Sequence, residues 1–262
     1  MPTPKMPTRR LFDLDILAAT FEQAVALLGE AALRRDGRAQ VVVTPNVDHV
    51  VRLERAPDFK RRYAQADFLF ADGMPLVWAS RLLGAPLPER VTGADLFTAL
   101  CRQAQAHGWR VGLLGGMPGQ QALLAERFAQ HYPGLDIAIR CPSMQFDAHG
   151  PEGQQAAQWA RELDADILFV CLGMPKQENW SLHHAASLRG GILLCVGAAM
   201  EFAVGLQKRA PRRVQAAGLE WLWRLLGNPR RLWRRYLVDD PRFLLLCWRQ
   251  WRAGRRRAKG GE

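Results

Sequence analysis

The sequence predicts an α/β fold, a Rossmann-like doubly wound and mostly parallel sheet with helices on both faces, followed by a basic amphipathic helical C-terminal appendage. Short β-rich runs alternate with helical stretches up to about residue 204, as in parallel sheets. The runs Ile167–Cys171 and Ile192–Val196 are apolar on both faces, as expected for strands covered by helices on both sides. Beyond residue 204 arginine and tryptophan become frequent, so we divide the chain into a Rossmann-like domain, residues 1–204, which we call the body, and an appendage, residues 205–262.

Six strands and six helical stretches are expected in the first 204 residues. The expected strands are Gln40–Thr44, Asp67–Ala71, Trp109–Leu114, Leu135–Arg140, Asp166–Leu172 and Gly191–Val196. The expected helical stretches are Thr20–Arg34, Asp48–Gln65, Ala94–Ala106, Gln120–His131, Gln154–Leu163 and Gln177–Leu188. A chain of 262 residues, 48% of them hydrophobic, can bury a hydrophobic core large enough to fold without disulfides.

The cysteines and the N-terminal residues favour a cytoplasmic location. The five cysteines are scattered and form no CxxC pair, which disfavours a disulfide framework and a zinc site. The N-terminal residues mix basic and acidic side chains before any long apolar run, unlike a signal peptide.

Polar and glycine-rich residues gather after five of the expected strands. In open parallel sheets a ligand binds beyond the carboxyl ends of the strands, so these segments are expected to form the site. They are Thr44–His49, Asp72–Pro75, Gly115–Gly119, Gly173–Glu178 and Gly197–Glu201.

Asp72 is the candidate general base. It follows an apolar run directly, and a partly desolvated carboxylate at a strand end can take a proton from a hydroxyl group. Capping of the following helix explains an aspartate here equally well. Thr44 and Asn46 are candidates for hydrogen bonds to a polar ligand, although Asn46 also suits an ordinary turn.

The loop Gly115–Gly119 leads from a strand into a helix. Backbone N–H groups of Gly115 and Gly116 are candidates for binding a phosphate or a nucleotide edge. A tight turn that requires positive φ explains the same glycines. The glycines do not spell GxGxxG and no GK[ST] follows, which disfavours a dinucleotide oxidoreductase and a P-loop enzyme.

No metal site is expected. Asp164-Ala165-Asp166 has the DxD pattern of many metal-dependent glycosyltransferases, but it precedes a strand on the edge opposite the glycine loops, where helix-end chemistry explains it better. His183 and His184 are adjacent, so on a helix they face different directions.

The last 58 residues carry the positive charge of the chain. They hold 16 Lys and Arg against 4 Asp and Glu, whereas residues 1–204 hold 20 against 21, and they contain five of the nine tryptophans. Such asymmetry indicates a polyanionic partner. On a helical wheel Arg230, Arg231, Arg234 and Arg235 fall in one arc, opposite an apolar arc.

Three interpretations of this appendage remain open. Helices with tryptophan on one face and arginine on the other suit an anionic bilayer surface. The same charges suit a nucleic-acid backbone, and the apolar faces would also suit packing on the body of the protein. Asp240 before Pro241 indicates the start of a further helix, in which Arg242, Arg249 and Arg252 share one side.

A series of motifs runs in order within the region from about Leu11 to Trp248. They are Thr44-Pro45-Asn46, Ala71–Pro75 (ADGMP), Arg90–Asp95 (RVTGAD), Leu113–Gly119 (LLGGMPG), Leu172–Glu178 (LGMPKQE), Arg209-Ala210-Pro211, Gly218–Leu226 (GLEWLWRLL) and Asn228–Tyr236 (NPRRLWRRY). Together they resemble the motifs of the WecG/TagA/CpsF glycosyltransferases, glycosyltransferase family 26. Arg213 stands where this family commonly has tryptophan.

The resemblance implies an inverting enzyme that transfers a hexose-type sugar from a UDP-sugar to a polyprenyl-diphosphate-linked sugar, for a bacterial surface polysaccharide or exopolysaccharide. It implies no cofactor and no essential metal, peripheral association with the anionic inner face of the cell membrane, and it allows a homo-oligomer. By motif position Asp72 takes the role of the base. The residues implied to bind substrate are Thr44, Asn46, Arg90, Gln177, Arg224, Arg231 and Arg234, to which we add Gly115, Gly116 and Glu178 from the strand-end loops.

One alternative function belongs to a different class. A Rossmann-like nucleotide-binding module could use the basic appendage to bind nucleic acid. It would show strongly salt-dependent binding to DNA or RNA and no turnover of UDP-sugars. The leading interpretation expects no nucleic-acid partner.

Overall fold

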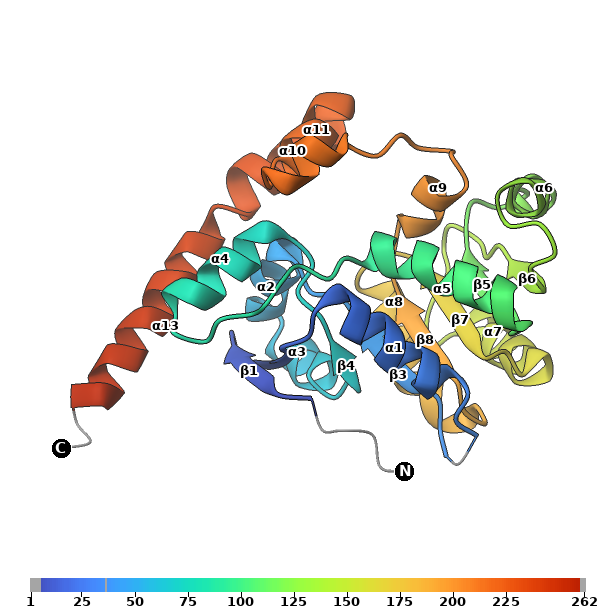
Figure 1. Cartoon of the computed structure of the whole chain (residues 1–262), viewed down its shortest axis with the longest axis horizontal. Coiled ribbons are helices and arrows are strands. Elements are labelled where there is room, and N and C mark those ends of the chain that lie inside the picture. Colours follow the sequence, from blue (N-terminus) through green and yellow to red (C-terminus); the bar gives the residue numbers. More distant parts are fainter. Residues whose placement is uncertain (1–5, 36, 260–262) are drawn as a thin grey trace.

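The computed structural model describes residues 6–35 and 37–259 and confirms the α/β prediction. Its centre is a six-stranded sheet in which every neighbouring pair of strands is parallel (Figure 1). In order across the sheet the strands are β4 (Phe68–Leu69), β3 (Gln40–Val43), β8 (Ile192–Cys195), β7 (Ile167–Cys171), β5 (Val111–Gly115) and β6 (Ile137–Arg140).

Helices cover both faces of this sheet and give it two hydrophobic cores. Within β7, Leu168 and Val170 point into one core, whereas Ile167 and Phe169 point into the other. This alternation explains why the central strands are apolar at every position. The helices of the body are α1 (Phe21–Ala32), α2 (Val47–Glu54), α3 (Pro57–Tyr63), α4 (Met74–Leu82), α5 (Gly93–His107), α6 (Gln121–His131), α7 (Pro151–Leu163), α8 (Lys176–His184) with the short η1 (Ala185–Ser187), and α9 (Ala199–Ala203).

The structure differs from the predicted elements in several places, and helix α4 (Met74–Leu82), for example, was not among the expected helical stretches. A separate antiparallel hairpin of β1 (Thr8–Leu11) and β2 (Leu14–Leu17) precedes the first helix. The single helical stretch expected at residues 48–65 is two helices, because Pro57 forces an extended backbone on Ala56. The strand expected at residues 67–71 pairs only at Phe68 and Leu69, on the edge of the sheet.

The appendage is a chain of helices that crosses the carboxyl edge of the sheet and then extends away from the body (Figure 1). Its last helix is not detached, since Phe243 and Cys247 are buried in the core that also contains the β1–β2 hairpin. The elements are α10 (Arg212–Ala216), α11 (Glu220–Gly227), α12 (Pro229–Arg234), the π-helical turn η2 (Arg235–Asp239) and α13 (Arg242–Lys259).

Among the contacts that fasten this appendage to the body, two fix its path. The side chain of Gln250 accepts a hydrogen bond of 2.8 Å from the backbone N–H of Phe12, in the hairpin turn. Gly218 lies so close to Trp78 of α4 that an added Cβ would be 2.8 Å from the indole ring, which requires glycine there. Among the described helices, none is both long enough and apolar enough to cross a membrane.

Candidate active site

A cavity of about 390 Å³ lies between the strand-end loops of the body and the appendage. The body contributes Asn46, Asp72 and Arg90 to its wall, and the appendage contributes Arg224 and Arg235. Apolar side chains complete the lining on the appendage side, namely Trp221, Tyr236, Phe243 and Leu244. The cavity therefore joins a charged floor to an aromatic wall.

Asp72 lies on the floor of this cavity because backbone contacts fix the segment after β4. Its N–H donates a hydrogen bond of 2.8 Å to the carbonyl of Pro45, which joins the loops that follow β3 and β4. Its carboxylate accepts a bond of 3.4 Å from the N–H of Gly93, at the N-terminus of α5. Gly73 is the N-cap of α4 and makes no side-chain cap, so Asp72 is not the cap of that helix.

The pKa of Asp72 is raised to about 6. Burial is the largest cause, and the negative charge of Glu220 adds to it, whereas Arg224, the Gly93 N–H and Arg90 lower the pKa. At neutral pH the carboxylate is ionised, yet it is a stronger base than an ordinary aspartate. This combination suits a general base.

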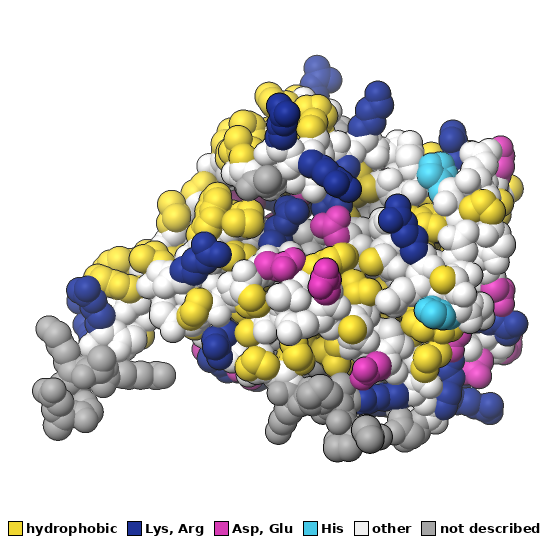
Figure 2. Space-filling view, viewed as in Figure 1, with side chains coloured by type: hydrophobic (Ala, Val, Ile, Leu, Met, Phe, Trp, Pro, Cys, Tyr) yellow, Lys and Arg dark blue, Asp and Glu magenta, His cyan; other side chains and the backbone are white. Residues whose placement is uncertain are grey.

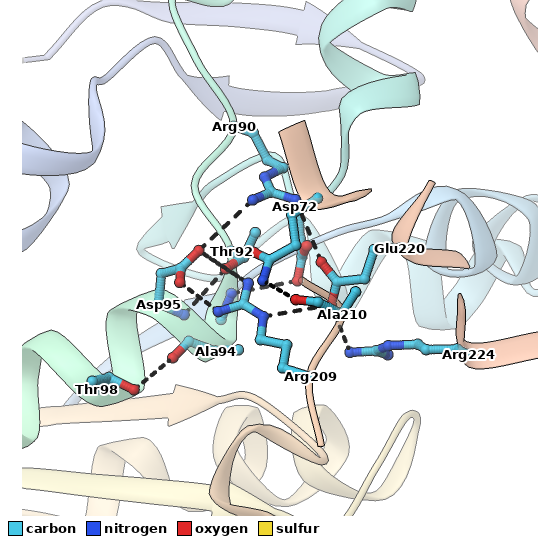
Figure 3. Close-up of polar contacts among 12 residues, drawn as sticks. Asp72, Arg90, Thr92, Ala94, Asp95, Thr98, Arg209, Ala210, Glu220 and Arg224 are labelled. Atoms are coloured by element: carbon cyan, nitrogen blue, oxygen red, sulfur yellow. Dashed lines mark hydrogen bonds and ion pairs between the residues drawn. The ribbon is translucent and has the colours of Figure 1, made fainter. Parts of the chain in front are cut away.

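A cluster of arginines surrounds Glu220, the first residue of α11 (Figure 3). Its Oε2 accepts a hydrogen bond of 3.4 Å from Arg90, and its Oε1 lies 3.4 Å from Arg224 and 3.6 Å from Nε of Arg209. Arg209 also forms a bidentate pair with Asp95 of α5. One carboxylate of the appendage is therefore shared by three guanidinium groups.

These guanidinium groups have unused hydrogen-bonding capacity. The Nε atoms of Arg209, Arg224 and Arg235 are buried and have no hydrogen-bond partner. Buried donors without an acceptor are costly, and an anion placed among them would satisfy them. The arrangement is therefore suited to binding phosphate groups.

A second cavity, of about 550 Å³, lies on the other side of the same side chains. Its wall includes Phe202 of α9 and Lys208 of the linker, the first part of the appendage (residues 205–211) that leads to α10. Trp223 and Asn228, farther along the appendage, also line it. The two cavities share one partition, formed by Glu220, Arg224, Arg235 and Tyr236.

Three of the predicted binding residues lie buried beneath the loops. Thr44 is packed under Gly93, where an added Cβ would be 3.0 Å from its hydroxyl oxygen. The amide oxygen of Gln177 accepts bonds from the N–H groups of Gly173 (3.1 Å) and Gly197 (2.9 Å), and its amide group donates to Glu178. Gln177 therefore joins the loops after β7 and β8.

Glu178 is fully buried, and its Oε2 has no hydrogen-bond partner. Burial raises its pKa to about 7, and the hydrogen bond from Gln177 partly offsets this rise.

Asn46 serves the fold and also lines the site. Its side chain caps α2 by accepting a hydrogen bond from the N–H of His49. It also lines the cavity over Asp72.

Gly115 and Gly116 lie at the end of β5, three strands away from β3. Both have positive φ, and a Cβ at Gly115 would lie 2.6 Å from that of Cys171 on the neighbouring strand. The tight-turn interpretation therefore accounts for both glycines. Their role in substrate binding stays a prediction.

The arginines of the appendage do not lie as the helical wheel places them. Arg234 is exposed and lines neither cavity, the side chain of Arg231 lies outside the described part of the chain, and Arg235 turns inward to Asp48 (3.5 Å). Arg234 and Arg235 are consecutive, so their side chains point about 100° apart around the helix axis and can face different surroundings. A π-helical turn, in which the N–H of Asp240 bonds to the carbonyl of Arg235, begins at this residue.

Sequence reasoning did not single out Glu220, Arg209 or Arg235 as site residues. Glu220 stands within GLEWLWRLL and Arg209 within the Arg-Ala-Pro segment, but neither segment shows by itself which loop it faces. The available signal for Glu220 was its isolation, since residues 205–238 contain no other acidic side chain.

Neither the adjacent pair His183 and His184 nor the segment Asp164-Ala165-Asp166 indicates a metal site. Within residues 6–35 and 37–259, no three His, Cys, Asp or Glu side chains are grouped so as to hold a metal ion. Asp164 ends α7 in a left-handed conformation, and Asp166 accepts bonds from Arg35 and from the N–H of Arg110. Both aspartates therefore act structurally, as their place before a strand predicted.

Exposed hydrophobic side chains gather on the appendage and on the neighbouring helix α4. Figure 2 shows them over α10 and α11 and along the extending α13, with charged side chains in the region between the appendage and the body. The most exposed are Leu82, Leu226, Trp233, Leu237, Leu244 and Trp248. The apolar residues of α13 thus divide between packing on the body and exposure.

A Rossmann-like sheet with a carboxylate and an arginine cluster at its carboxyl edge is typical of enzymes that act on phosphate-bearing substrates. The model of the Glycosyl transferase WecG/TagA/CpsF family matches residues 9–257. The chain belongs to this family and is a glycosyltransferase, which confirms the resemblance seen in the motifs.

Relatives with an assigned activity align along most of this chain. The chain is 29% identical over 248 residues to an N-acetylglucosaminyldiphosphoundecaprenol N-acetyl-beta-D-mannosaminyltransferase of Bacillus spizizenii, an alignment that covers 95% of this chain and 93% of the relative. It is 28% identical over 205 residues to the protein of the same name from Staphylococcus aureus, covering 78% of this chain and 77% of the relative.

Proposed function

We propose that this glycosyltransferase moves a hexose-type sugar from a UDP-sugar to a sugar carried on polyprenyl diphosphate, with inversion at the anomeric carbon. The observation that carries the proposal is Asp72, a half-buried carboxylate of raised pKa, in one cavity with an arginine cluster whose donors lack acceptors. The names of both relatives support a lipid-linked acceptor and make N-acetylmannosamine the first donor sugar to test.

Asp72 would act as the base on the acceptor. The acceptor hydroxyl attacks the anomeric carbon, its proton passes to the carboxylate of Asp72, and the bond from the sugar to UDP breaks. The raised pKa makes Asp72 a better proton acceptor while leaving it ionised at neutral pH.

The departing UDP gains negative charge, which must be neutralised. Arg90, Arg209 and Arg224 converge beside Asp72 and are suited to this task, because a planar guanidinium group binds phosphate oxygens through two hydrogen bonds. We therefore propose that the diphosphate is stabilised by arginines and that the reaction needs no metal ion.

The appendage, residues 205–262, would hold the enzyme on the inner face of the cell membrane. Its exposed leucine and tryptophan side chains and its arginines match the interfacial and headgroup regions of an anionic bilayer. The aromatic wall of the cavity over Asp72 belongs to the same appendage, so a lipid-linked acceptor would meet the base close to the membrane.

The proposal is tested by UDP release from a panel of UDP-sugars, with a polyprenyl-diphosphate-linked N-acetylglucosamine in vesicles, with and without EDTA. We expect release with one donor and little effect of EDTA. Release that EDTA abolishes would contradict the metal-independent mechanism. Absence of release with every donor, together with salt-dependent binding to DNA or RNA, would favour the nucleic-acid alternative.

The proposed base predicts a pH dependence. Because the pKa of Asp72 is raised to about 6, its base form is lost as the pH falls through 6, and kcat/KM should fall about tenfold for each pH unit below that value. An ordinary aspartate would keep its activity down to a pH of about 4. The measurement is a pH profile of kcat/KM between about 4.5 and 8, a range in which most proteins stay folded.

Two other buried carboxyl groups titrate in this range and provide the controls. Burial raises the pKa of Asp240 to about 6 and that of Glu178 to about 7. Asp240→Asn and Glu178→Gln should each keep the acidic limb of the profile. A limb that disappears in either variant would assign it to that group and contradict the role of Asp72.

A further inference from the structure

Glu220 lies among the arginines that, in the proposed function, bind the diphosphate of the donor. It is one-fifth exposed, comes from the appendage, and faces Arg90 of the body, Arg209 of the linker and Arg224 of its own helix at 3.4–3.6 Å (Figure 3). Distances of 3.4 Å and more are long for charge-assisted hydrogen bonds, which are usually near 2.8 Å. The carboxylate holds the arginines together without saturating them.

The remaining acceptors near these arginines do not satisfy them either. Asp95 takes two N–H groups of Arg209 and lies 3.9 Å from Arg90. The Nε atoms of Arg209 and Arg224 stay without a partner. A diphosphate carries more oxygen acceptors than one carboxylate and would satisfy such donors more completely.

We propose that Glu220 is a stand-in counter-ion, which keeps the arginine cluster assembled while the site is empty and gives up its place to the diphosphate of the donor. The inference rests on the proposed function and adds a positioning residue to it. Glu220 touches no reacting atom; it acts by orienting arginines that do.

The same carboxylate also acts on the proposed base. The groups that interact electrostatically with Asp72 or hydrogen-bond to it are Glu220, Arg224 and Arg209 from the appendage and its linker, and Arg90, Tyr63 and the Gly93 N–H from the body. Glu220 is the negative charge among them that raises the pKa of Asp72, whereas Arg224 and Arg90 lower it. Removing the charge of Glu220 should therefore lower the pKa of Asp72.

The test uses the full chain and Glu220→Gln, with Glu126→Gln on the exposed surface of α6 as the matched control. Inorganic pyrophosphate is titrated by calorimetry, and the carboxyl group of Asp72 is titrated by NMR in protein labelled with carbon-13 at aspartate. In the Glu220 variant we expect pyrophosphate to bind roughly fivefold more tightly or better, because one repelling charge is gone. The Asp72 titration should move about one pH unit lower, the scale of a neighbouring like charge.

Kinetics provide a second readout that a merely structural ion pair would not give. The donor KM should fall together with kcat, since the anion site binds better while the base becomes weaker. Weaker pyrophosphate binding, or an unchanged Asp72 titration, would overturn the proposal and leave Glu220 as a link between appendage and body. If Glu220→Gln does not fold, Glu220→Asp, which withdraws the carboxylate by one methylene group, should shift pyrophosphate binding in the same direction.

These measurements separate this inference from the proposed function. Pyrophosphate binding and the Asp72 titration require neither a sugar donor nor an acceptor. If Glu220→Gln shows both expected shifts but the wild-type protein transfers no sugar, the proposed function is overturned while Glu220 is supported as a counter-ion. Normal transfer with neither shift would overturn the role of Glu220 alone.

Discussion

Replacing Asp72 by asparagine is expected to lower kcat for sugar transfer by about 10²–10⁴-fold, the usual loss when a positioned base is removed. Asparagine has the same shape and can accept the hydrogen bond from Gly93, so the loop after β4 should stay in place. Only the ability to take the proton of the acceptor hydroxyl is lost. The measurement is UDP release under saturating donor and acceptor.

The stability of this variant provides the control. The folded-state pKa of Asp72 lies above its ordinary value, so folding favours the protonated form and the ionised carboxylate destabilises the fold at neutral pH. Asparagine removes that charge, and the thermal unfolding midpoint at pH 7 should not fall. A variant that unfolds at a lower temperature would have lost activity for a structural reason, and one with wild-type kcat would exclude Asp72 as the base.

Deletion of residues 205–262 is expected to abolish transfer and to prevent sedimentation with anionic vesicles. The deletion removes Glu220, Arg224 and Arg235 and one whole wall of the cavity over Asp72. The sheet and most of both cores lie within residues 6–204, so the body should retain its secondary structure by circular dichroism. A truncated protein with undiminished turnover would exclude a part for the appendage in the site.

The deletion also uncovers part of the body, so a point variant gives the sharper comparison. Phe243 and Cys247 are buried against the hairpin, and the ring of Phe243 lies 5.1 Å from that of Phe12. Exposing a hairpin side chain that they cover, such as Phe12, costs about 1.5–3 kcal/mol. Arg224→Gln leaves this packing intact and should lower kcat by about 10²–10³-fold through loss of one anion-stabilising donor. Arg102→Gln, at an exposed arginine of α5 in the body, is the matched control and should behave as wild type.

The sheet could be predicted from the sequence because its strands are buried on both faces. In such strands every position is apolar, and the loops between them carry glycine, proline and polar residues, so both signals mark the same boundaries. The β1–β2 hairpin was missed because its turn residues, Phe12 and Asp13, adopt positive φ without the Asn-Gly or Asp-Gly signature.

Within the site, the sequence indicated segments better than side-chain directions. Asn46, Asp72, Arg90 and Arg224 line one cavity, as the position of their motifs at strand ends and in the appendage suggested. Gln177 belongs to an equally polar loop, yet it points inward and joins two backbone segments. A local pattern does not determine which neighbour a long polar side chain reaches, because that depends on the loop packed beside it.

Arg235 could not be placed for a different reason. Arg234 and Arg235 are consecutive, so about 100° separates their side chains around the helix axis. Arg235 lies at one edge of the basic arc and reaches Asp48, whereas Arg234 faces solvent. A helical wheel does not show which edge of such an arc the body covers.

The partition between the two cavities has a consequence for how ligands bind. Any ligand on one side that shifts Arg224 or Tyr236 also changes the wall of the other side, since both cavities use the same side chains. The affinities of the two ligands are then linked. Thermodynamics requires that each ligand changes the affinity of the other by the same factor. Two ligands, one in each cavity, would then influence each other through four side chains of the appendage.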